Sequence, residues 1–336
     1  MRQDLFQGPA GPHGWTMAAC RLVTALAAAA VIGGCESPLR LEGVKASQAA
    51  PVRRSDMFQQ AAENGRALVV VGTHGLVLRS TDSGQNWSRQ ELSGWPSLID
   101  IASCGDGRFA ALATESQVFV STDDGASWKA HPISTEESPQ AITCDPGNRL
   151  WVVGSFSTIM SSADGGANWE DHSIGEDIIL NNIQFIDATH ALVFGEFGTN
   201  YRSADGGGTW AAGPPLPNEV YPQDVFFSDA NEGWVVGLAG EIRHTADGGA
   251  TWTLESTGTL VPVYSVARQG GQLFAVGGEG TLLRRDGERW IRIEHGEPVR
   301  QLLRVLRPLG SDRLLIGGAA GALYVVPNNA AAARAG

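Results

Sequence analysis

The feature that most constrains the fold of this chain is a short pattern that returns at a fixed interval. A small hydroxyl residue, an Asp, a Gly and a Trp occur five times in the spacing SxDxGxxW, and the five aspartates are 41 or 42 residues apart. Such an interval is typical of stacked supersecondary units and not of independent domains. The recurring residues are Ser80, Asp82, Gly84, Trp87, Ser121, Asp123, Gly125, Trp128, Ser162, Asp164, Gly166, Trp169, Ser203, Asp205, Gly207, Trp210, Thr245, Asp247, Gly249 and Trp252.

A second repeated element lies upstream of each copy. It reads as a short apolar strand, a turn and another strand, as in VVVGTHGLVL, and it occurs seven times along the chain. Another apolar stretch precedes each hairpin and a short strand follows each Trp, which makes four strands per unit. These units predict an all-β fold, a seven-bladed β-propeller over residues 55–327. The alternative is a ring of six blades with loose ends.

The last unit has only three recognisable strands, so its sheet lacks a partner at one edge. The segment RLEGVKA, residues 40–46, lies in a linker over residues 36–54. We expect it to supply the missing strand and close the ring, because closure removes an exposed sheet edge. Residues 328–336, NNAAAARAG, are expected to form a disordered tail.

Each residue type in the repeated pattern has a structural task in a tight turn between the third and fourth strands. Asp accepts backbone N–H bonds, the hydroxyl bonds locally, Gly adopts positive φ, and Trp buries a large ring. A calcium site requires several oxygen donors around one ion, and most copies offer one carboxylate. The pattern therefore favours a structural turn, with no metal and no cofactor.

The N-terminus reads as an export signal. A single arginine at position 21 is followed by an apolar run over residues 22–32 and then by VIGGC, which ends at Cys35. The apolar run suits a signal peptide and is too short to cross a bilayer as a helix. VIGGC resembles a bacterial lipobox, so residues 1–35 are expected to be a lipoprotein signal peptide, with a start possible at Met17. We expect an exported chain, lipid-anchored at Cys35 on the periplasmic side of the inner or the outer membrane.

Composition argues against a nucleic-acid partner, and the cysteines leave open whether the chain contains a disulfide. The formal net charge is −12 and the pI about 5.0, which does not suit binding to phosphate backbones, so no nucleic-acid partner is expected. Cys104 and Cys144 occupy matching places in neighbouring repeats. Outside the cytoplasm they can form a disulfide, and two buried free thiols are the alternative.

In a propeller, the turns between second and third strands share one face with the connections that enter each inner strand. Loops on such a scaffold often carry function. We therefore predict a partner-binding face built from His74, Phe156, Glu196, Phe197, Tyr221, Tyr264 and Glu279.

The alternative is a carbohydrate-active enzyme. Cleavage of a glycosidic bond requires one protonated and one ionised carboxyl group on either side of it. Glu196 and Glu279 are the candidates for this pair. No Ser/His/Asp signature, phosphate loop or metal-spaced His/Cys set is visible, so no catalytic residue is assigned.

Taken together, the lipobox, the seven hairpins and the repeated SxDxGxxW turn resemble the photosystem II stability and assembly factor family, whose repeats are of the BNR or Asp-box type. The resemblance covers residues 55–327 approximately. It implies a non-enzymatic protein, expected as a monomer, that docks onto membrane or envelope proteins during their assembly. An arginine-rich patch has been implicated in that role in the family. Here the arginines late in the third strands read as solvated strand residues: Arg79, Arg202, Arg243 and Arg284.

Overall fold

The computed structural model describes residues 41–296 and 299–329. The chain divides into two compact units, Met1–Ala49 and Ala50–Gly336. In the first unit the described element is helix α2 (Glu42–Ala49). The proposed signal peptide, including Cys35, lies outside the described residues, as do residues 330–336. None of the helices in the described part of the chain is long and apolar enough to cross a membrane.

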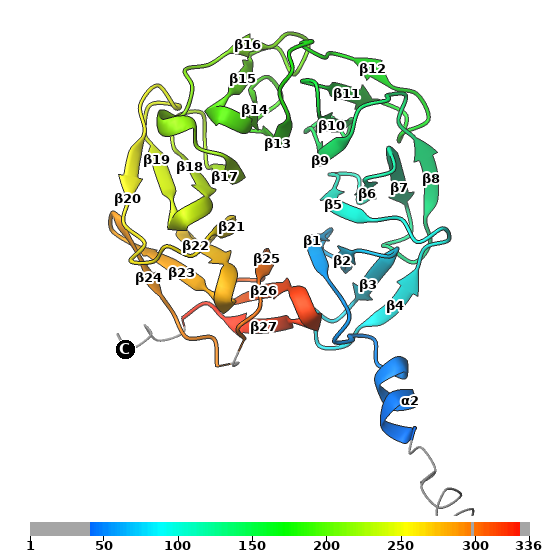
Figure 1. Cartoon of the computed structure of the whole chain (residues 1–336). Coiled ribbons are helices and arrows are strands. Elements are labelled where there is room, and N and C mark those ends of the chain that lie inside the picture. Colours follow the sequence, from blue (N-terminus) through cyan, green and yellow to red (C-terminus); the bar gives the residue numbers. More distant parts are fainter. Residues whose placement is uncertain (1–40, 297–298, 330–336) are drawn as a thin grey trace, which may run out of the picture. The chain divides into compact units, whose positions relative to one another are not determined.

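The second unit consists of seven antiparallel sheets arranged around a central axis, with their first strands innermost (Figure 1). Six sheets have four strands in simple up-and-down order and the seventh has three. This confirms the predicted seven-bladed β-propeller. The blades, in chain order, are β1 (Phe58–Glu63), β2 (Leu68–Gly72), β3 (Leu76–Ser80) and β4 (Ser88–Glu91); β5 (Leu98–Ser103), β6 (Phe109–Ala113), β7 (Gln117–Ser121) and β8 (Lys129–Pro132); β9 (Pro139–Cys144), β10 (Leu150–Gly154), β11 (Ile159–Ser162) and β12 (Glu170–Asp171); β13 (Leu180–Phe185), β14 (Ala191–Gly195), β15 (Asn200–Ser203) and β16 (Ala211–Ala212); β17 (Pro222–Phe227), β18 (Gly233–Gly237), β19 (Ile242–Thr245) and β20 (Thr253–Glu255); β21 (Val263–Gln269), β22 (Gln272–Gly277), β23 (Leu282–Asp286) and β24 (Arg289–Arg292); β25 (Leu303–Leu309), β26 (Arg313–Gly318) and β27 (Leu323–Pro327).

Short 3₁₀ turns accompany five of the connections. They are η1 (Glu196–Gly198), η2 (Pro217–Glu219), η3 (Leu238–Gly240), η4 (Gly278–Gly280) and η5 (Ala319–Gly321). Four of them, η1, η3, η4 and η5, join the second and third strands of a blade.

The core is divided among the interfaces between blades. The second strands, such as β2 and β14, are buried at every residue, except for the first residue of β22 and of β26, because both faces of each sheet are covered by neighbouring blades. This is why they are continuous apolar runs instead of alternating patterns. Seven buried clusters each join one blade to the next, including one that joins blade 7 to blade 1.

The expected closing strand over residues 40–46 is wrong. Residues 42–49 form helix α2 with no buried side chain, and blade 7 has three strands among the described residues. The segment EGVKASQA is rich in helix-forming Glu, Lys, Ala and Gln and has one β-branched residue, so its intrinsic preference is helical.

The ring is closed instead by side-chain packing and by a few polar contacts. Phe58 and Leu68 of blade 1 pack in one cluster with Val305 and Leu315 of blade 7. The backbone N–H of Gly321 donates to the carbonyl oxygen of Asp56 at 2.9 Å. Closure therefore depends on residues just before β1 and not on a strand exchanged from the linker.

Cys104 and Cys144 form a disulfide, with their Cα atoms 5.3 Å apart. Cys104 follows the inner strand of blade 2 and Cys144 ends the inner strand of blade 3. Of the two alternatives left open by the sequence, the bridge between neighbouring repeats is the one the structure contains.

Candidate functional site

The five Asp-box turns lie between the third and fourth strands and have the same hydrogen-bond circuit. In blade 3, the Ser162 hydroxyl donates to Asp164 Oδ1 at 2.9 Å and accepts from the N–H of Gly166 at 2.8 Å. Asn168 donates its backbone N–H to Oδ1 at 2.8 Å and its side-chain amide to Oδ2 at 2.6 Å. Both carboxylate oxygens are thus occupied by donors from the turn itself.

The same contacts recur in the other four copies. Hydrogen bonds from the residue four places after the Asp lower the pKa of each box carboxyl from 3.8 to about 2, and the hydroxyl residue before it acts in the same direction. Among the described residues there is no group of three or more His, Cys, Asp or Glu side chains that could hold a metal ion.

The Gly and Trp of each box attach a blade to the one before it. Trp210 of blade 4 packs against the cluster between blades 3 and 4, at 6.3 Å between ring centroids from Trp151. Gly207 has φ of 90° and lies so close to the Trp151 ring that a Cβ at this position would overlap it. The boxes therefore form part of the folding core on one face of the ring.

The opposite face carries the strand 2 to strand 3 turns. Their tip residues adopt positive φ, with values of 61° at His74, 52° at Phe156, 57° at Phe197 and 54° at Glu279. The side chains of the two phenylalanines at these tips are 48% and 59% exposed. Non-glycine residues at positive φ are uncommon and cluster at functional sites.

The connections that enter the inner strands add further aromatic surface on this face. Trp95 is 70% exposed and Tyr221 is 38% exposed. Trp95 lies before β5 and Tyr221 directly precedes β17, so both belong to connections that lead into an inner strand. The structure thus places Phe156, Phe197 and Tyr221 on this face, together with Trp95.

Two residues predicted for this face, Glu196 and Tyr264, have other roles in the structure. The Glu196 carboxylate accepts a hydrogen bond from the backbone N–H of Ile179 at 3.1 Å, so it holds the entry to β13. Glu115 does the same for Ser97, with both carboxylate oxygens 3.2 Å from its N–H. Tyr264 is not on the rim but lines the central channel.

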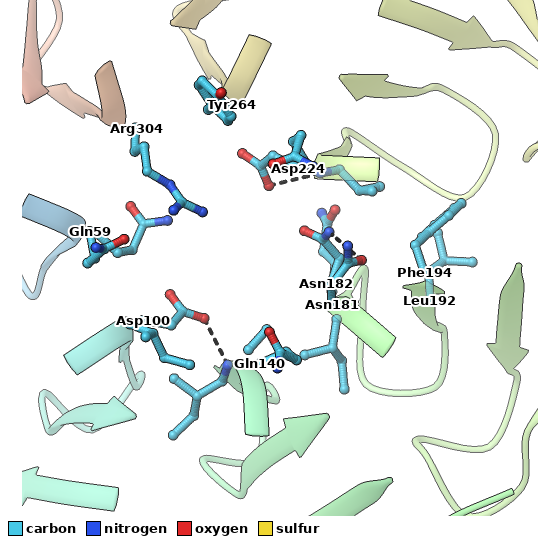
Figure 2. Close-up of a pocket in the computed structure, with 18 residues that line it drawn as sticks. Gln59, Asp100, Gln140, Asn181, Asn182, Leu192, Phe194, Asp224, Tyr264 and Arg304 are labelled. Atoms are coloured by element: carbon cyan, nitrogen blue, oxygen red, sulfur yellow. Dashed lines mark hydrogen bonds between the residues drawn. The ribbon is translucent and has the colours of Figure 1, made fainter. Parts of the chain in front are cut away.

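The channel has a ring of side chains that sequence reasoning missed. In each blade the register of the inner strand shifts at its second residue, and a β-bulge of this kind redirects a side chain. All seven bulged residues line one cavity of about 210 Å³ (Figure 2). They are Gln59, Ile99, Gln140, Asn181, Gln223, Tyr264 and Arg304.

Two carboxylates lie at the next position of the inner strands. Asp100 accepts from the N–H of Ile142 in the following blade at 2.8 Å, and Asp224 accepts from the N–H of Val266 at 3.0 Å. Enclosure among the inner strands raises the pKa of both carboxyls to about 6, against the opposing effect of these N–H donors. The signal available in the sequence was a polar residue at the second or third place of otherwise apolar inner strands.

The interpretation of the third-strand arginines as solvated residues requires correction. Arg79 donates from Nε to the carbonyl oxygen of Asp124 in the next blade at 2.6 Å. Arg202 is half-buried next to Gly249 of the following box, and Arg243 is 5% exposed and paired with Glu241. Arg79 and Arg202 are therefore interblade contacts and Arg243 is buried in an ion pair within blade 5, so these three side chains are not solvated strand residues.

The chain shares sequence features with one family and its fold with several. Residues 210–335 match the family model for the photosynthesis system II assembly factor YCF48. The structure of YCF48 bound to a D1 peptide has a TM-score of 0.70 at 17% identity, over 83% of this chain and 94% of that one. YCF48 from Cyanidioschyzon merolae has a TM-score of 0.68 at 18% identity, over 82% and 96%. A search of curated protein sequences found no significant match.

The fold also resembles an enzyme. Virginiamycin B lyase from Staphylococcus aureus has a TM-score of 0.67 at 10% identity, over 79% of this chain and 92% of the lyase. The propeller architecture by itself therefore does not separate binding from catalysis. The resemblance to photosystem II assembly factors is nevertheless confirmed, because the family model matches residues 210–335 and the YCF48 structures have the same propeller fold.

Proposed function

We propose that this photosystem II assembly factor-like propeller is a non-enzymatic docking module for membrane or envelope proteins, and that it binds them with the face formed by the strand 2 to strand 3 turns. We call this the tip face. The observation that carries the proposal is the exposure of Trp95, Phe156, Phe197 and Tyr221 there. Aromatic side chains are enriched at protein interfaces and dominate their energetics.

The scaffold supports this role. Each tip residue belongs to a turn closed by a backbone hydrogen bond, as from the N–H of Thr199 to the carbonyl of Glu196 at 3.1 Å. Rigid presentation lowers the entropy lost on binding. The structure of YCF48 bound to a D1 peptide, which has a similar fold, supports a peptide-binding role for this propeller.

The glycosidase alternative is less well supported. Glu196 already accepts a backbone N–H bond that organises its own blade, and Glu279 lies two blades away on an exposed turn tip. A hydrolase requires the two carboxyl groups to face a common substrate bond. A glycan screen that compares Glu196→Ala and Glu279→Ala with the unmodified protein tests it, and cleavage lost in both variants would favour the enzyme.

The docking proposal is tested by placing a photo-crosslinking amino acid at Phe156 or at Phe197, and at Gln85 as a control on the opposite, Asp-box face. We expect both tip-face positions to form the same adduct with one membrane or envelope protein, identified by mass spectrometry. The Gln85 position should form none. Equal adducts from both faces, or none from the tip face, would contradict the proposal.

Affinity for the crosslinked partner then provides a quantitative test. Phe197→Ala should weaken binding by about tenfold or more, as expected for an exposed aromatic anchor. Leu254→Ala is the matched control, since Leu254 is also 59% exposed but lies on the outermost strand of blade 5. Equal losses in the two variants would indicate a general effect on folding or solubility.

We also propose that the chain is exported and lipid-anchored through Cys35, and that it acts as a monomer on the periplasmic side. The support is the order of charge, apolar run and VIGGC in the N-terminal sequence. Metabolic labelling with a fatty acid should mark the wild-type protein, and Cys35→Ala should abolish the label and release the protein from membranes. Labelling that persists in this variant would refute the anchor, and sedimentation of the released protein tests the monomer.

A further inference from the structure

The bulged ring in the channel presents polar groups that have no partner within the protein. Gln59, Gln140 and Gln223 line the cavity, and their side-chain amides form no hydrogen bond with any residue that the structure describes. Gln59 and Gln223 are half-buried and Gln140 is exposed, so their amides are open to the channel, where they can bond with water or a ligand. Three convergent free amides in one small cavity therefore offer donors and acceptors to something that enters the channel.

The same cavity separates positive from negative charge. Arg304 of blade 7 lies over the ring of Tyr264, with its guanidinium carbon 5.7 Å from the ring centroid. It makes no hydrogen bond or ion pair with any described residue. Figure 2 shows Arg304 pointing into the opening that Asp100 and Asp224 also face.

The two carboxylates differ in how far Arg304 offsets their charge. Asp100 experiences an attractive effect from Arg304, whereas no arginine acts on Asp224. Asp224 is held by N–H and hydroxyl donors from Val225, Val266 and Ser265, at 2.8 to 3.0 Å. Oδ2 accepts two of these bonds and Oδ1 accepts one, so Oδ1 keeps a lone pair for a further donor. The cavity thus has at one wall a cation that no described group hydrogen-bonds, and at another an anion held by backbone N–H and hydroxyl donors alone.

The size of the cavity limits what fits there. A volume of about 210 Å³ corresponds to about seven water molecules at ~30 Å³ each, which is enough for a small organic molecule and too little for a folded segment. A ligand with one anionic and one cationic end would pair with both walls, because charge-assisted hydrogen bonds are the strongest that these side chains can make.

We propose that the central channel binds a small zwitterion, of the class of free α-amino acids, with its carboxylate on Arg304 and its ammonium group on Asp224. The amides of Gln59, Gln140 and Gln223 complete its hydrogen bonds. This site is separate from the tip-face aromatics, so the proposal of a channel ligand does not depend on the docking role.

The first test uses blocked ligands on the unmodified protein. A panel of free α-amino acids is compared with their N-acetyl and C-amide derivatives by thermal shift and calorimetry at pH 8, where both aspartates are ionised. We expect at least one free amino acid to raise the melting temperature, and both blocked forms to bind at least tenfold more weakly. No binding by any free amino acid, or equal binding of the blocked forms, would overturn the proposal.

The second test assigns the two ends. Arg304→Gln should lower affinity for the free amino acid to that of its C-amide, without further weakening binding of the C-amide. Asp224→Asn should lower affinity for the free amino acid to that of the N-acetyl form. Arg300→Gln and Asp177→Asn are charge-matched controls at exposed positions outside the cavity and should bind as the wild type does. Wild-type affinity in Arg304→Gln, or equal losses in the controls, would contradict the assignment.

Discussion

At the scale of single residues, the box aspartates show how a carboxylate can be committed to folding. Asp164 accepts three hydrogen bonds from a side-chain amide, a backbone N–H and a hydroxyl within its own turn. Its two oxygens are directed at these donors and not at a ligand. A residue type that suggests a binding loop in the sequence is therefore a turn-forming element in the structure.

This arrangement predicts the response of stability to acid. Because the pKa of each box carboxyl falls from 3.8 in the unfolded chain to about 2 in the folded one, its stabilisation is complete above about pH 4. It is lost as the pH falls through about 2. We expect the melting temperature to drop between pH 4 and pH 2, as followed by circular dichroism.

The Asp164→Ala variant provides the control for this prediction. It should melt a few degrees lower than the wild type at pH 7, and the difference should shrink as the pH approaches 2. A difference that stays constant over this range would show that the carboxylate charge is not responsible.

At the scale of elements, the packing of each Asp-box turn against the preceding blade stabilises the propeller. Gly207 combines positive φ with close approach to Trp151, whereas Gly175 has φ of 81° and open space around it. Substituting Ala at Gly175 should cost about 1 kcal/mol from backbone strain alone. Ala at Gly207 should cost roughly 2–4 kcal/mol, because the ring of Trp151 must also move.

Urea denaturation of both variants measures this difference. The comparison separates strain within the turn from packing between blades, since both glycines share the left-handed conformation. If the two variants lost equal free energy, the packing of box against blade would contribute nothing measurable.

At the scale of the whole molecule, the ring is closed by the residues just before β1. The Asp56 carboxylate is 3% exposed, lies 2.9 Å from Arg89 Nη1 and accepts the N–H of Arg53 at 2.7 Å. Asp56→Ala leaves the largely enclosed Arg89 without this partner and should cost roughly 2–4 kcal/mol. Thermal or urea unfolding checks the value.

A chain that begins at Ala50 is the complementary experiment. Helix α2 has no buried residue, so its removal should change the free energy of unfolding by less than about 0.5 kcal/mol. A large loss on removal of residues 1–49 would mean that the linker closes the ring after all.

The disulfide acts at the same scale, because it joins blade 2 to blade 3 across 40 residues of chain. Closing a loop of this length restricts the unfolded chain and is worth about 3–4 kcal/mol in the loop-entropy model. Reduction should lower the urea midpoint accordingly. The double variant Cys104→Ala and Cys144→Ala should be insensitive to reductant, and a wild-type midpoint in reductant would contradict the prediction.

The sequence alone determined the features that repeat within each blade. Strand order, the box turns and the turns between second and third strands depend on neighbours a few residues away, so a pattern that recurs every 41 or 42 residues is sufficient to place them. The tertiary structure decided which distant residues meet. Arg304 and Asp224 face one cavity, Cys144 reaches Cys104, and Asp56 meets Gly321 because the sheets pack into a closed ring. Residues 42–49 form helix α2 and not the expected strand because their own composition favours a helix.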